Sequence, residues 1–194
     1  MVPTKTDIAL RTAGMVADVL RGAVLVGAVY AALVDEVEGG IRLGLVFAIL
    51  LAPRLAGLPR PFDLAVCILL PLAAAASLFH WYREIIWLDW VLHCLCTGAL
   101  AAMTYLLLLR TPLLPHQRHH GRSAVVFLTT VVGLALGVFW EFYEWYAEVV
   151  AGVRIGVGYS DTIADLAMDT LGSIAAGLAL MAWLANGRNP FPNR

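Results

Sequence analysis

Long apolar runs fill most of this chain, and they restrict it to folds that a lipid bilayer can accommodate. Hydrophobic residues make up 61% of the 194 residues and charged residues 14%, whereas soluble domains have about 45–50% and about 25%. A helix that crosses a bilayer needs about 20 mostly apolar residues. Runs of that kind lie near residues 13–34, 41–58, 62–82, 86–109, 123–150 and 162–185. The sequence therefore predicts an all-α membrane protein, a single domain of residues 1–194 with six transmembrane helices in one bundle.

The positively charged residues predict which side of the membrane each connection faces. With six spans, most fall at the termini and in the second and fourth connections: Lys5, Arg11, Arg54, Arg60, Arg110, Arg118, Arg122, Arg188 and Arg194. The opposite side holds Arg42, Arg83 and Arg154. Because Lys and Arg gather in cytoplasmic loops, we expect both termini in the cytoplasm, an N-in/C-in topology. The net charge of −1 argues against nucleic acid as a partner.

Three polar motifs interrupt the apolar runs at similar depths. They are Asp89-x3-His93 in the fourth run, Glu141-x2-Glu144 in the fifth, and Asp161-x3-Asp165-x3-Asp169 in the sixth. With the orientation above, all three lie in the outer half of the bilayer. An ionisable side chain near the centre of a membrane helix costs about 2.5 kcal/mol or more, so it indicates function. We therefore expect the three motifs to meet in one buried acidic site.

Some of these side chains also have a simpler interpretation. Asp89 could be an interfacial residue stabilised by the helix dipole, and His93 could bond to a neighbouring helix. Asp161 lies at the start of the sixth run and could cap its helix. Asp165 and Asp169 are harder to explain in this way, because they lie inside an apolar helix where an unpaired Asp is costly.

The fifth run carries the deepest glutamate. Glu141 and Glu144 share a helix face, and like charges at this spacing repel each other, so they need a cation, a shared proton or arginine partners. Glu148 is near enough to water to ionise by itself. The aromatic residues around them are typical of an interfacial belt, although Trp145, together with Arg83 at the outer end of the third run, could contact a substrate head group.

One imidazole among many carboxylates is a ligand set for a divalent metal ion. Such a set suits Mg²⁺, Mn²⁺ or Ca²⁺, or a carboxylate-rich Zn²⁺ or iron site. The residues that would bind the metal are Asp89, His93, Glu141, Glu144, Asp165 and Asp169. Glu141, Glu144 and His93 are also the candidates for a catalytic role. A network of protonated carboxylates without a metal is the alternative.

Other patterns predict helix packing rather than chemistry. Gly133-x3-Gly137 gives the fifth helix a small-residue face, and Ser173-x3-Gly177 does the same for the sixth. Asp18 and Arg21 are three residues apart on the first helix, so we expect them to pair or to line an inner vestibule.

The polar motifs give the chain a resemblance to the YjdF family of small bacterial inner-membrane proteins. The matching pieces are Asp89-x3-His93 followed by Gly98, Glu141-x2-Glu144-Trp145, and Asp161-Thr162-x2-Asp165 followed by Gly172. A looser likeness to VanZ-like membrane proteins uses the Asp-x3-His motif and the late Asp165, Asp169 and Gly172. The chain departs from the YjdF pattern just before Asp161, where it has Val157-Gly158-Tyr159-Ser160 instead of a further Gly-Asp. The resemblance implies six spans and a multi-pass location in the bacterial plasma (inner) membrane, and it implies no particular reaction.

The sequence leads to three hypotheses about function, all with the lipid bilayer as partner. The first is a metal-dependent, hydrolase-type membrane enzyme that acts on a lipid or lipid-linked substrate, with the metal polarising an oxygen atom and activating water. The second is an ion- or proton-coupled transporter or a lipid-translocation factor, because intramembrane acids commonly relay protons or bind ions. The third is a non-catalytic membrane scaffold. The substrate, the identity of the metal and the oligomeric state stay open.

Overall fold

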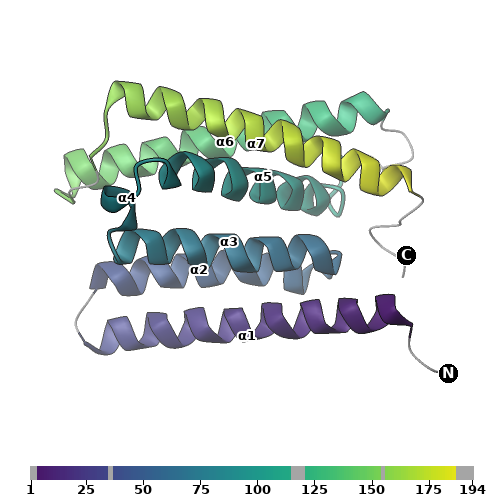
Figure 1. Ribbon diagram of the computed structural model, residues 1–194, viewed down its shortest axis with the longest axis horizontal. Coiled ribbons are helices and arrows are strands. Elements are labelled where there is room, and N and C mark those ends of the chain that lie inside the picture. The colour runs from purple at the N-terminus through teal and green to yellow at the C-terminus, as the bar shows by residue number, and fades with distance from the viewer. Residues whose placement is uncertain (1–3, 35–36, 115–120, 154–155, 187–194) are drawn as a thin grey trace. The chain divides into compact units, whose positions relative to one another are not determined.

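The computed structural model describes residues 4–34, 37–114, 121–153 and 156–186, and the regular secondary structure in these ranges is entirely helical. This confirms the all-α prediction. The chain divides into two compact units between Glu84 and Ile85. The first contains helices α1 to α4, and the second contains α5, α6, η2 and α7 (Figure 1). The expected single domain of residues 1–194 stays a prediction.

The first unit is built from three long helices. They are α1 (Lys5–Leu33), α2 (Val37–Leu55) and α3 (Arg60–Leu78), each in contact with the other two. α1 begins with a capping box, in which the Thr4 hydroxyl accepts the Asp7 N–H at 3.2 Å and the Asp7 carboxylate accepts the Thr4 N–H at 3.0 Å. These bonds satisfy backbone groups that the helix itself leaves without partners.

The third helix is shorter than the apolar run of residues 62–82 predicts. It ends at Leu78, and α4 (Trp81–Glu84) follows as a separate short helix. His80 lies between them with a φ of 59°, a left-handed conformation that interrupts a right-handed helix. The Tyr82 hydroxyl donates to the Ala73 carbonyl at 3.2 Å and ties α4 to α3. The prediction of one continuous helix to residue 82 is therefore wrong at its end.

A buried arginine links the three long helices of the first unit. Arg21 is 4% exposed, and its guanidinium donates to Asp18 at 2.9 Å, to the Leu50 carbonyl at 2.8 Å and to Asp63. Asp18 also accepts from Arg54 at 3.0 Å. We call these four charged side chains the Arg21 network. The predicted pairing of Asp18 with Arg21 is confirmed, whereas Asp63 is a buried partner that the sequence analysis did not identify.

The second unit is a bundle of three long helices with a π-helical extension. It contains α5 (Leu88–Leu108), α6 (Arg122–Trp145), η2 (Tyr146–Val150) and α7 (Tyr159–Ala185). The last helix packs against both α5 and α6, which also contact each other. Figure 1 shows α7 running alongside both helices.

Small residues let the helices of the second unit approach closely. A Cβ added to Gly172 would collide with the Cys94 carbonyl, and one added to Gly133 would collide with the Ser173 side chain. A Cβ on Gly98 would lie 2.6 Å from the Gly172 carbonyl oxygen. Close backbone approach through small residues is a common mode of helix packing in membranes. The small-residue faces predicted for the fifth and sixth helices are confirmed.

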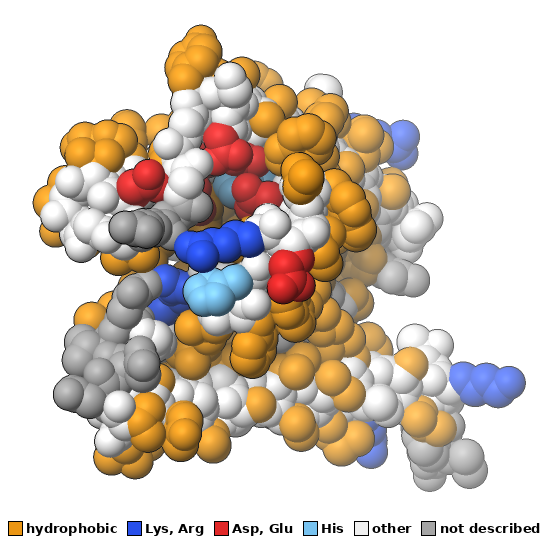
Figure 2. Space-filling model, turned by 60° about the vertical axis from the view of Figure 1, so that its left-hand side comes forward, with side chains coloured by type: hydrophobic (Ala, Val, Ile, Leu, Met, Phe, Trp, Pro, Cys, Tyr) orange, Lys and Arg blue, Asp and Glu red, His pale blue; other side chains and the backbone are white. Residues whose placement is uncertain are grey.

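Among the described residues, five helices are long and apolar enough to cross a membrane: α1, α3, α5, α6 extended by η2, and α7. Their exposed surfaces carry many large hydrophobic side chains, and Figure 2 shows hydrophobic groups over much of the visible surface. The remaining long helix, α2, carries three charged residues, Glu38, Arg42 and Arg54, within its 19 residues. The six-span count and the orientation therefore stay predictions. Four residues used for the orientation lie outside the described residues: Arg118, Arg154, Arg188 and Arg194.

Candidate metal centre

Three helices bring polar side chains to one end of the second unit, where α5 begins, α6 ends and α7 begins. Asp89 and His93 lie in the first two turns of α5, and Asp165 and Asp169 lie in the second and third turns of α7. Glu141 is close to the end of α6. Residues from all three predicted motifs therefore lie within reach of one another.

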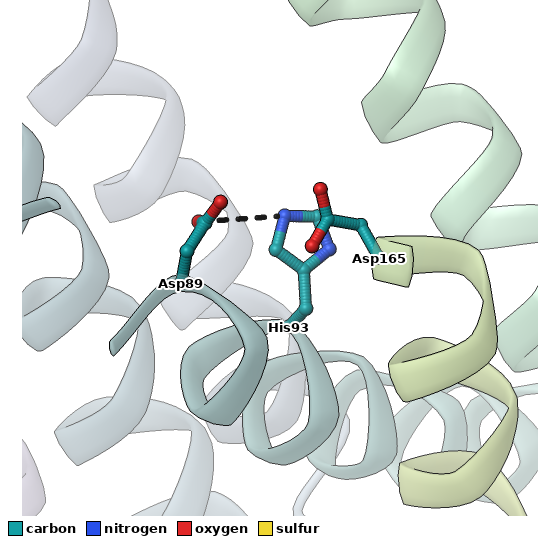
Figure 3. A group of neighbouring side chains, drawn as sticks. All are labelled: Asp89, His93 and Asp165. Carbon is teal, nitrogen blue, oxygen red and sulfur yellow. Dashed lines mark ion pairs between the residues drawn. The ribbon is translucent and has the colours of Figure 1, made fainter. Parts of the chain in front are cut away.

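The first group of possible ligands consists of Asp89, His93 and Asp165 (Figure 3). One oxygen or nitrogen atom of each lies within 4.8 Å of the other two. The distance from His93 Nε2 to Asp89 Oδ1 is 3.8 Å, which is too long for a hydrogen bond but compatible with two ligands about 2.0–2.2 Å from one shared ion. Asp165, from α7, lies against the imidazole ring in Figure 3 and is fully buried.

His93 also belongs to a second group, with Glu141 and Glu144 of α6, whose ligand atoms again lie within 4.8 Å of one another. Glu141 is buried and Glu144 is partly buried. Trp140 Nε1 donates to Glu144 Oε1 at 2.9 Å. The Trp140 ring meets the His93 ring edge to face, with centroids 6.3 Å apart. Trp140 therefore fixes one carboxylate and packs against the imidazole at the same time.

A pair of hydrogen bonds fixes the orientation of the His93 ring. His93 Nδ1 is 3.2 Å from Asp169 Oδ1, and the Thr97 hydroxyl donates to the same oxygen at 2.6 Å. Because an ionised carboxylate only accepts, Nδ1 carries a proton in this arrangement, and Nε2 is the ring atom through which a neutral His93 could bind a metal. Carboxylates commonly hold metal-binding histidines in this way. The sequence analysis missed Thr97, although its spacing of four residues from His93 puts both on one helix face.

The position of Asp169 depends on a glycine in the neighbouring helix. A Cβ added to Gly137 of α6 would overlap the Asp169 carboxylate. The backbone of Asp169 is also held, since the Ser173 hydroxyl donates to its carbonyl at 2.7 Å. The small-residue face of α6 thus has two effects, because it packs the helices closely and leaves room for the carboxylate that orients His93.

The site contains more acidic side chains than basic partners. We call Asp89, Glu141, Glu144, Asp165 and Asp169 the acidic cluster. Within the described part of the chain, His93 is the only basic side chain that forms an ion pair with any of them. Four of their buried oxygens have no hydrogen-bond partner: Glu141 Oε1, Asp165 Oδ1, Asp165 Oδ2 and Asp169 Oδ2. Because an unpaired buried carboxylate is very unfavourable, these groups need protons or a cation.

The donor atoms suit a divalent ion. Carboxylate oxygens are the usual ligands of Mg²⁺, Ca²⁺ and Mn²⁺, and an added imidazole also suits Zn²⁺ and iron. Neither ligand group contains a cysteine. The arrangement is equally able to hold protons, so a bound metal, its identity and the catalytic roles stay predictions.

Two further acids have roles that differ from those of the cluster. α7 begins at Tyr159 with Gly158 as its N-cap, so the prediction that Asp161 caps the helix is wrong, because the helix has already begun before it. Glu148 Oε2 accepts backbone N–H groups of the segment before α7, including that of Val157 at 2.8 Å. Glu148 therefore stabilises the conformation of the segment between η2 and α7.

The two residues expected to contact a head group are both exposed. Arg83 belongs to α4 in the first unit, and Trp145 is the last residue of α6 in the second. Trp145 is 52% exposed. Their contact with a substrate stays a prediction.

The chain belongs to the predicted membrane protein family DUF2238, whose model matches residues 14–186. The match includes all of the acidic cluster and most of the helical part of the chain. No curated protein and no solved structure matches it. The family supports a membrane location, whereas the resemblance to YjdF and VanZ-like proteins and the bacterial inner membrane stay predictions.

Proposed function

We propose that this member of the DUF2238 family carries a divalent-metal centre at the acidic cluster and uses it for hydrolase-type chemistry on a lipid or lipid-linked substrate. The observation that supports this most directly is Asp165. It is fully buried, neither of its oxygens has a hydrogen-bond partner, and it lies within ligand distance of Asp89 and His93. A divalent cation would neutralise these carboxylates and use their free oxygens.

Each residue has a distinct part in this proposal. His93 binds through Nε2, because its Nδ1 faces Asp169. Asp89 and Asp165 supply oxygens from the two neighbouring helices. Asp169 uses Oδ1 to orient His93, while its Oδ2 lies against Gly137 of α6. Thr97 is a positioning residue, since it acts through Asp169.

The glutamates of α6 supply the remaining chemistry. Glu141 is buried and offers an unpartnered oxygen to the ion. Glu144 is partly buried and faces the same imidazole, so it is the candidate base that accepts the proton of an attacking water. A bound divalent metal would polarise a phosphoryl or carbonyl oxygen of the substrate and activate that water.

Aromatic side chains support a position near the surface of the membrane. Large exposed rings gather at the same helix ends as the acidic cluster: Trp87, Trp90, Trp145, Tyr146 and Tyr159. Tryptophan and tyrosine are enriched at the depth of lipid head groups. A substrate with its polar group at that depth would therefore be close to the cluster. The outer leaflet follows from the predicted N-in/C-in orientation.

Metal analysis of the purified protein is the decisive test. We expect about one equivalent of a divalent metal, or a rise in melting temperature when Mg²⁺, Mn²⁺, Zn²⁺ or Ca²⁺ is added. Asp165→Asn should abolish both effects. Glu84→Gln is the control, because Glu84 is an exposed carboxylate of the first unit. A protein without metal that no added divalent ion stabilises would contradict the proposal.

The second candidate function is an ion- or proton-coupled transporter or a lipid-translocation factor. Asp165 favours it too, because a buried carboxylate without partners can carry a proton. A transporter must expose its acids to the two sides in turn, whereas an enzyme of the outer leaflet need not. Cysteine placed at position 141, in a chain without Cys67, Cys94 and Cys96, should react with an impermeant reagent from outside alone if the enzyme proposal holds. Reaction from both sides would favour transport.

The orientation needs its own test, because the outer leaflet depends on it. A reporter that is active only in the cytoplasm should give signal when fused at Arg118 and none when fused at Arg154. The reverse result would move the acidic cluster to the inner side and remove the outer-leaflet part of the proposal, while leaving the metal centre untouched.

A further inference from the structure

The first unit has an open surface cavity of about 470 Å³ beside the first turns of α1. Its charged lining consists of Asp7, Arg11 and Asp18 from α1 and Arg60 from the start of α3. Two carboxylates and two guanidinium groups thus border one space. Which of these groups are already engaged decides what charge the cavity would accept.

Both carboxylates are engaged by protein donors. Asp7 accepts the backbone N–H and the hydroxyl of Thr4 in the capping box, at 3.0 and 2.7 Å. Asp18 accepts from Arg21 at 2.9 Å and from Arg54 at 3.0 Å. Neither therefore needs a cation from the cavity.

The two arginines that line the cavity are much less engaged. Arg11 forms no ion pair within 4.0 Å in the described part of the chain, although it lies in the electrostatic field of Asp7. The single ion pair of Arg60 is long, 3.6 Å to Asp63 Oδ2, and the same carboxylate already accepts from Arg21. Most of the N–H donors of Arg11 and Arg60 are therefore available to a ligand.

A glycine sets the position of one of these guanidinium groups. Arg60 lies across α1 at Gly14, where an added Cβ would be 3.2 Å from Arg60 Cζ and Nε. The absence of a side chain at residue 14 lets the guanidinium approach the helix surface next to the cavity. Leu10 and Met15 provide the apolar part of the lining, and both are exposed.

We infer that this cavity binds a phosphate group, either of an anionic lipid or of a free phosphate, between Arg11 and Arg60. The guanidinium fork matches phosphate oxygens in pairs of hydrogen bonds. The depth also fits, because α1 has 29 residues and is about 43 Å long, longer than a hydrocarbon core of about 30 Å. Arg11, in the second turn, is therefore close to head-group level, and Leu10 and Met15 could contact an acyl chain.

The test measures the melting temperature of the full-length protein in a nonionic detergent. Three additions are compared: phosphatidic acid, diacylglycerol with the same acyl chains, and inorganic phosphate against chloride at equal ionic strength. We expect phosphatidic acid at saturation to raise the melting temperature by at least about 4 °C, and diacylglycerol to leave it unchanged. A comparable rise with inorganic phosphate would identify a free phosphate as a sufficient ligand, and its absence would identify the lipid.

Substitutions of the two lining arginines test whether the rise in melting temperature depends on the cavity. Arg11→Gln and Arg60→Gln should each reduce the rise to less than half, whereas Arg122→Gln, at the start of α6 in the second unit, should keep it. Arg11 is exposed, so Arg11→Gln remains informative even if Arg60→Gln fails to fold. The inference is overturned if neither phosphate compound raises the melting temperature, or if Arg11→Gln responds like the parent. It is independent of the metal proposal, because metal binding should be the same in all three variants.

Discussion

Arg21 and Asp165 are both buried inside apolar helices, yet their surroundings are opposite. The guanidinium of Arg21 reaches two carboxylates and a backbone carbonyl. Asp165, fully buried in α7, has no hydrogen-bond partner for either oxygen. The first unit therefore pairs its buried carboxylate with arginines, although Asp63 Oδ2 has only a 3.6 Å ion pair with Arg60, while the second leaves an excess of acid beside one imidazole.

This difference separates a structural use of buried charge from a functional one. A buried ion pair that is internally satisfied needs nothing from outside and can hold helices together. Buried carboxylates that repel each other and have no protein partners require protons or a cation from outside the chain. Burying a charge is unfavourable in both units, but it indicates a structural role for the Arg21 network and a ligand-binding role for the acidic cluster.

The largest expected effect comes from breaking the Arg21 network. Arg21→Met leaves Asp63 buried without its main partner, so it should lower the free energy of unfolding by about 3–5 kcal/mol. Unfolding with denaturant in mixed micelles measures the loss. The double variant Arg21→Met with Asp63→Leu should recover much of the stability, because no charge is then left unpaired. If the double variant is less stable than the single one, the network is not a matched structural pair.

Removing one charge from the acidic cluster should raise the melting temperature in the absence of metal and weaken metal binding. Glu141→Gln or Asp165→Asn removes one charge from the acidic cluster at nearly constant shape. In the absence of divalent ions the melting temperature should rise, because repulsion decreases. The affinity for the ion should fall at least about 100-fold, beyond the 10–100-fold typical of losing an outer partner of a ligand.

Melting curves with and without Mn²⁺ or Zn²⁺ distinguish a ligand from a tolerated acid. Glu148→Gln serves as the matched control, since Glu148 fastens a connection and belongs to neither ligand group. A Glu141→Gln protein that is more stable than the parent in every condition, with metal binding retained, would count against a catalytic or ligand role for the Glu141-x2-Glu144 motif.

A smaller loss of metal affinity should follow when the orientation of the His93 ring is less well fixed but its metal-binding nitrogen is kept. Thr97→Val removes the hydroxyl that donates to Asp169 and preserves the shape of the side chain. Metal affinity should fall about tenfold, at the lower end of the range for such outer partners. Calorimetric titration measures the affinity, with Thr104→Val on the same helix as the control. Equal losses in both variants would indicate a general effect on α5 rather than a positioning role.

The smallest effect concerns the connection before α7. Glu148→Gln keeps an oxygen acceptor for the backbone of residues 156 and 157, so stability should change by less than about 0.5 kcal/mol. Glu148→Ala removes the acceptor and should cost about 1 kcal/mol. Hydrogen exchange at the Val157 amide should accelerate only in the alanine variant. Similar exchange in both variants would show that this carboxylate does not hold the connection.

The sequence predicted those features that depend on spacing along one helix. The apolar runs located the long helices, and the separation of four residues between Asp89 and His93 placed both on one face. It could not predict features that depend on a partner far along the chain. Asp63 is 42 residues from Arg21, and nothing in the local pattern connects them. Thr97 was missed for a related reason, because its importance appears only once Asp169 of another helix lies beside it.

Helix ends were the other source of error. The apolar run continued past Leu78, but the left-handed backbone of His80 ends α3 there, and hydrophobicity carries little information about such a residue. Asp161 was expected to precede its helix because Asp is a frequent N-cap. The backbone of Gly158 takes that place instead, so α7 begins earlier and brings Asp165 and Asp169 deeper into the helix than a later start would.

We expect the contact between Gly137 and Asp169 to matter also when the chain enters the membrane during synthesis. α7 is the least apolar of the five candidate spans, and on insertion scales each Asp near the middle of a helix adds about 2.5–3.5 kcal/mol. The recess that accepts the Asp169 carboxylate exists only on an α6 that has already been made. We therefore expect α7 to leave the translocon efficiently only when α5 and α6 are still beside it. A bulkier residue at position 137 would then appear first as a defect of biogenesis, with α7 left outside the bilayer, before it appears as a loss of function.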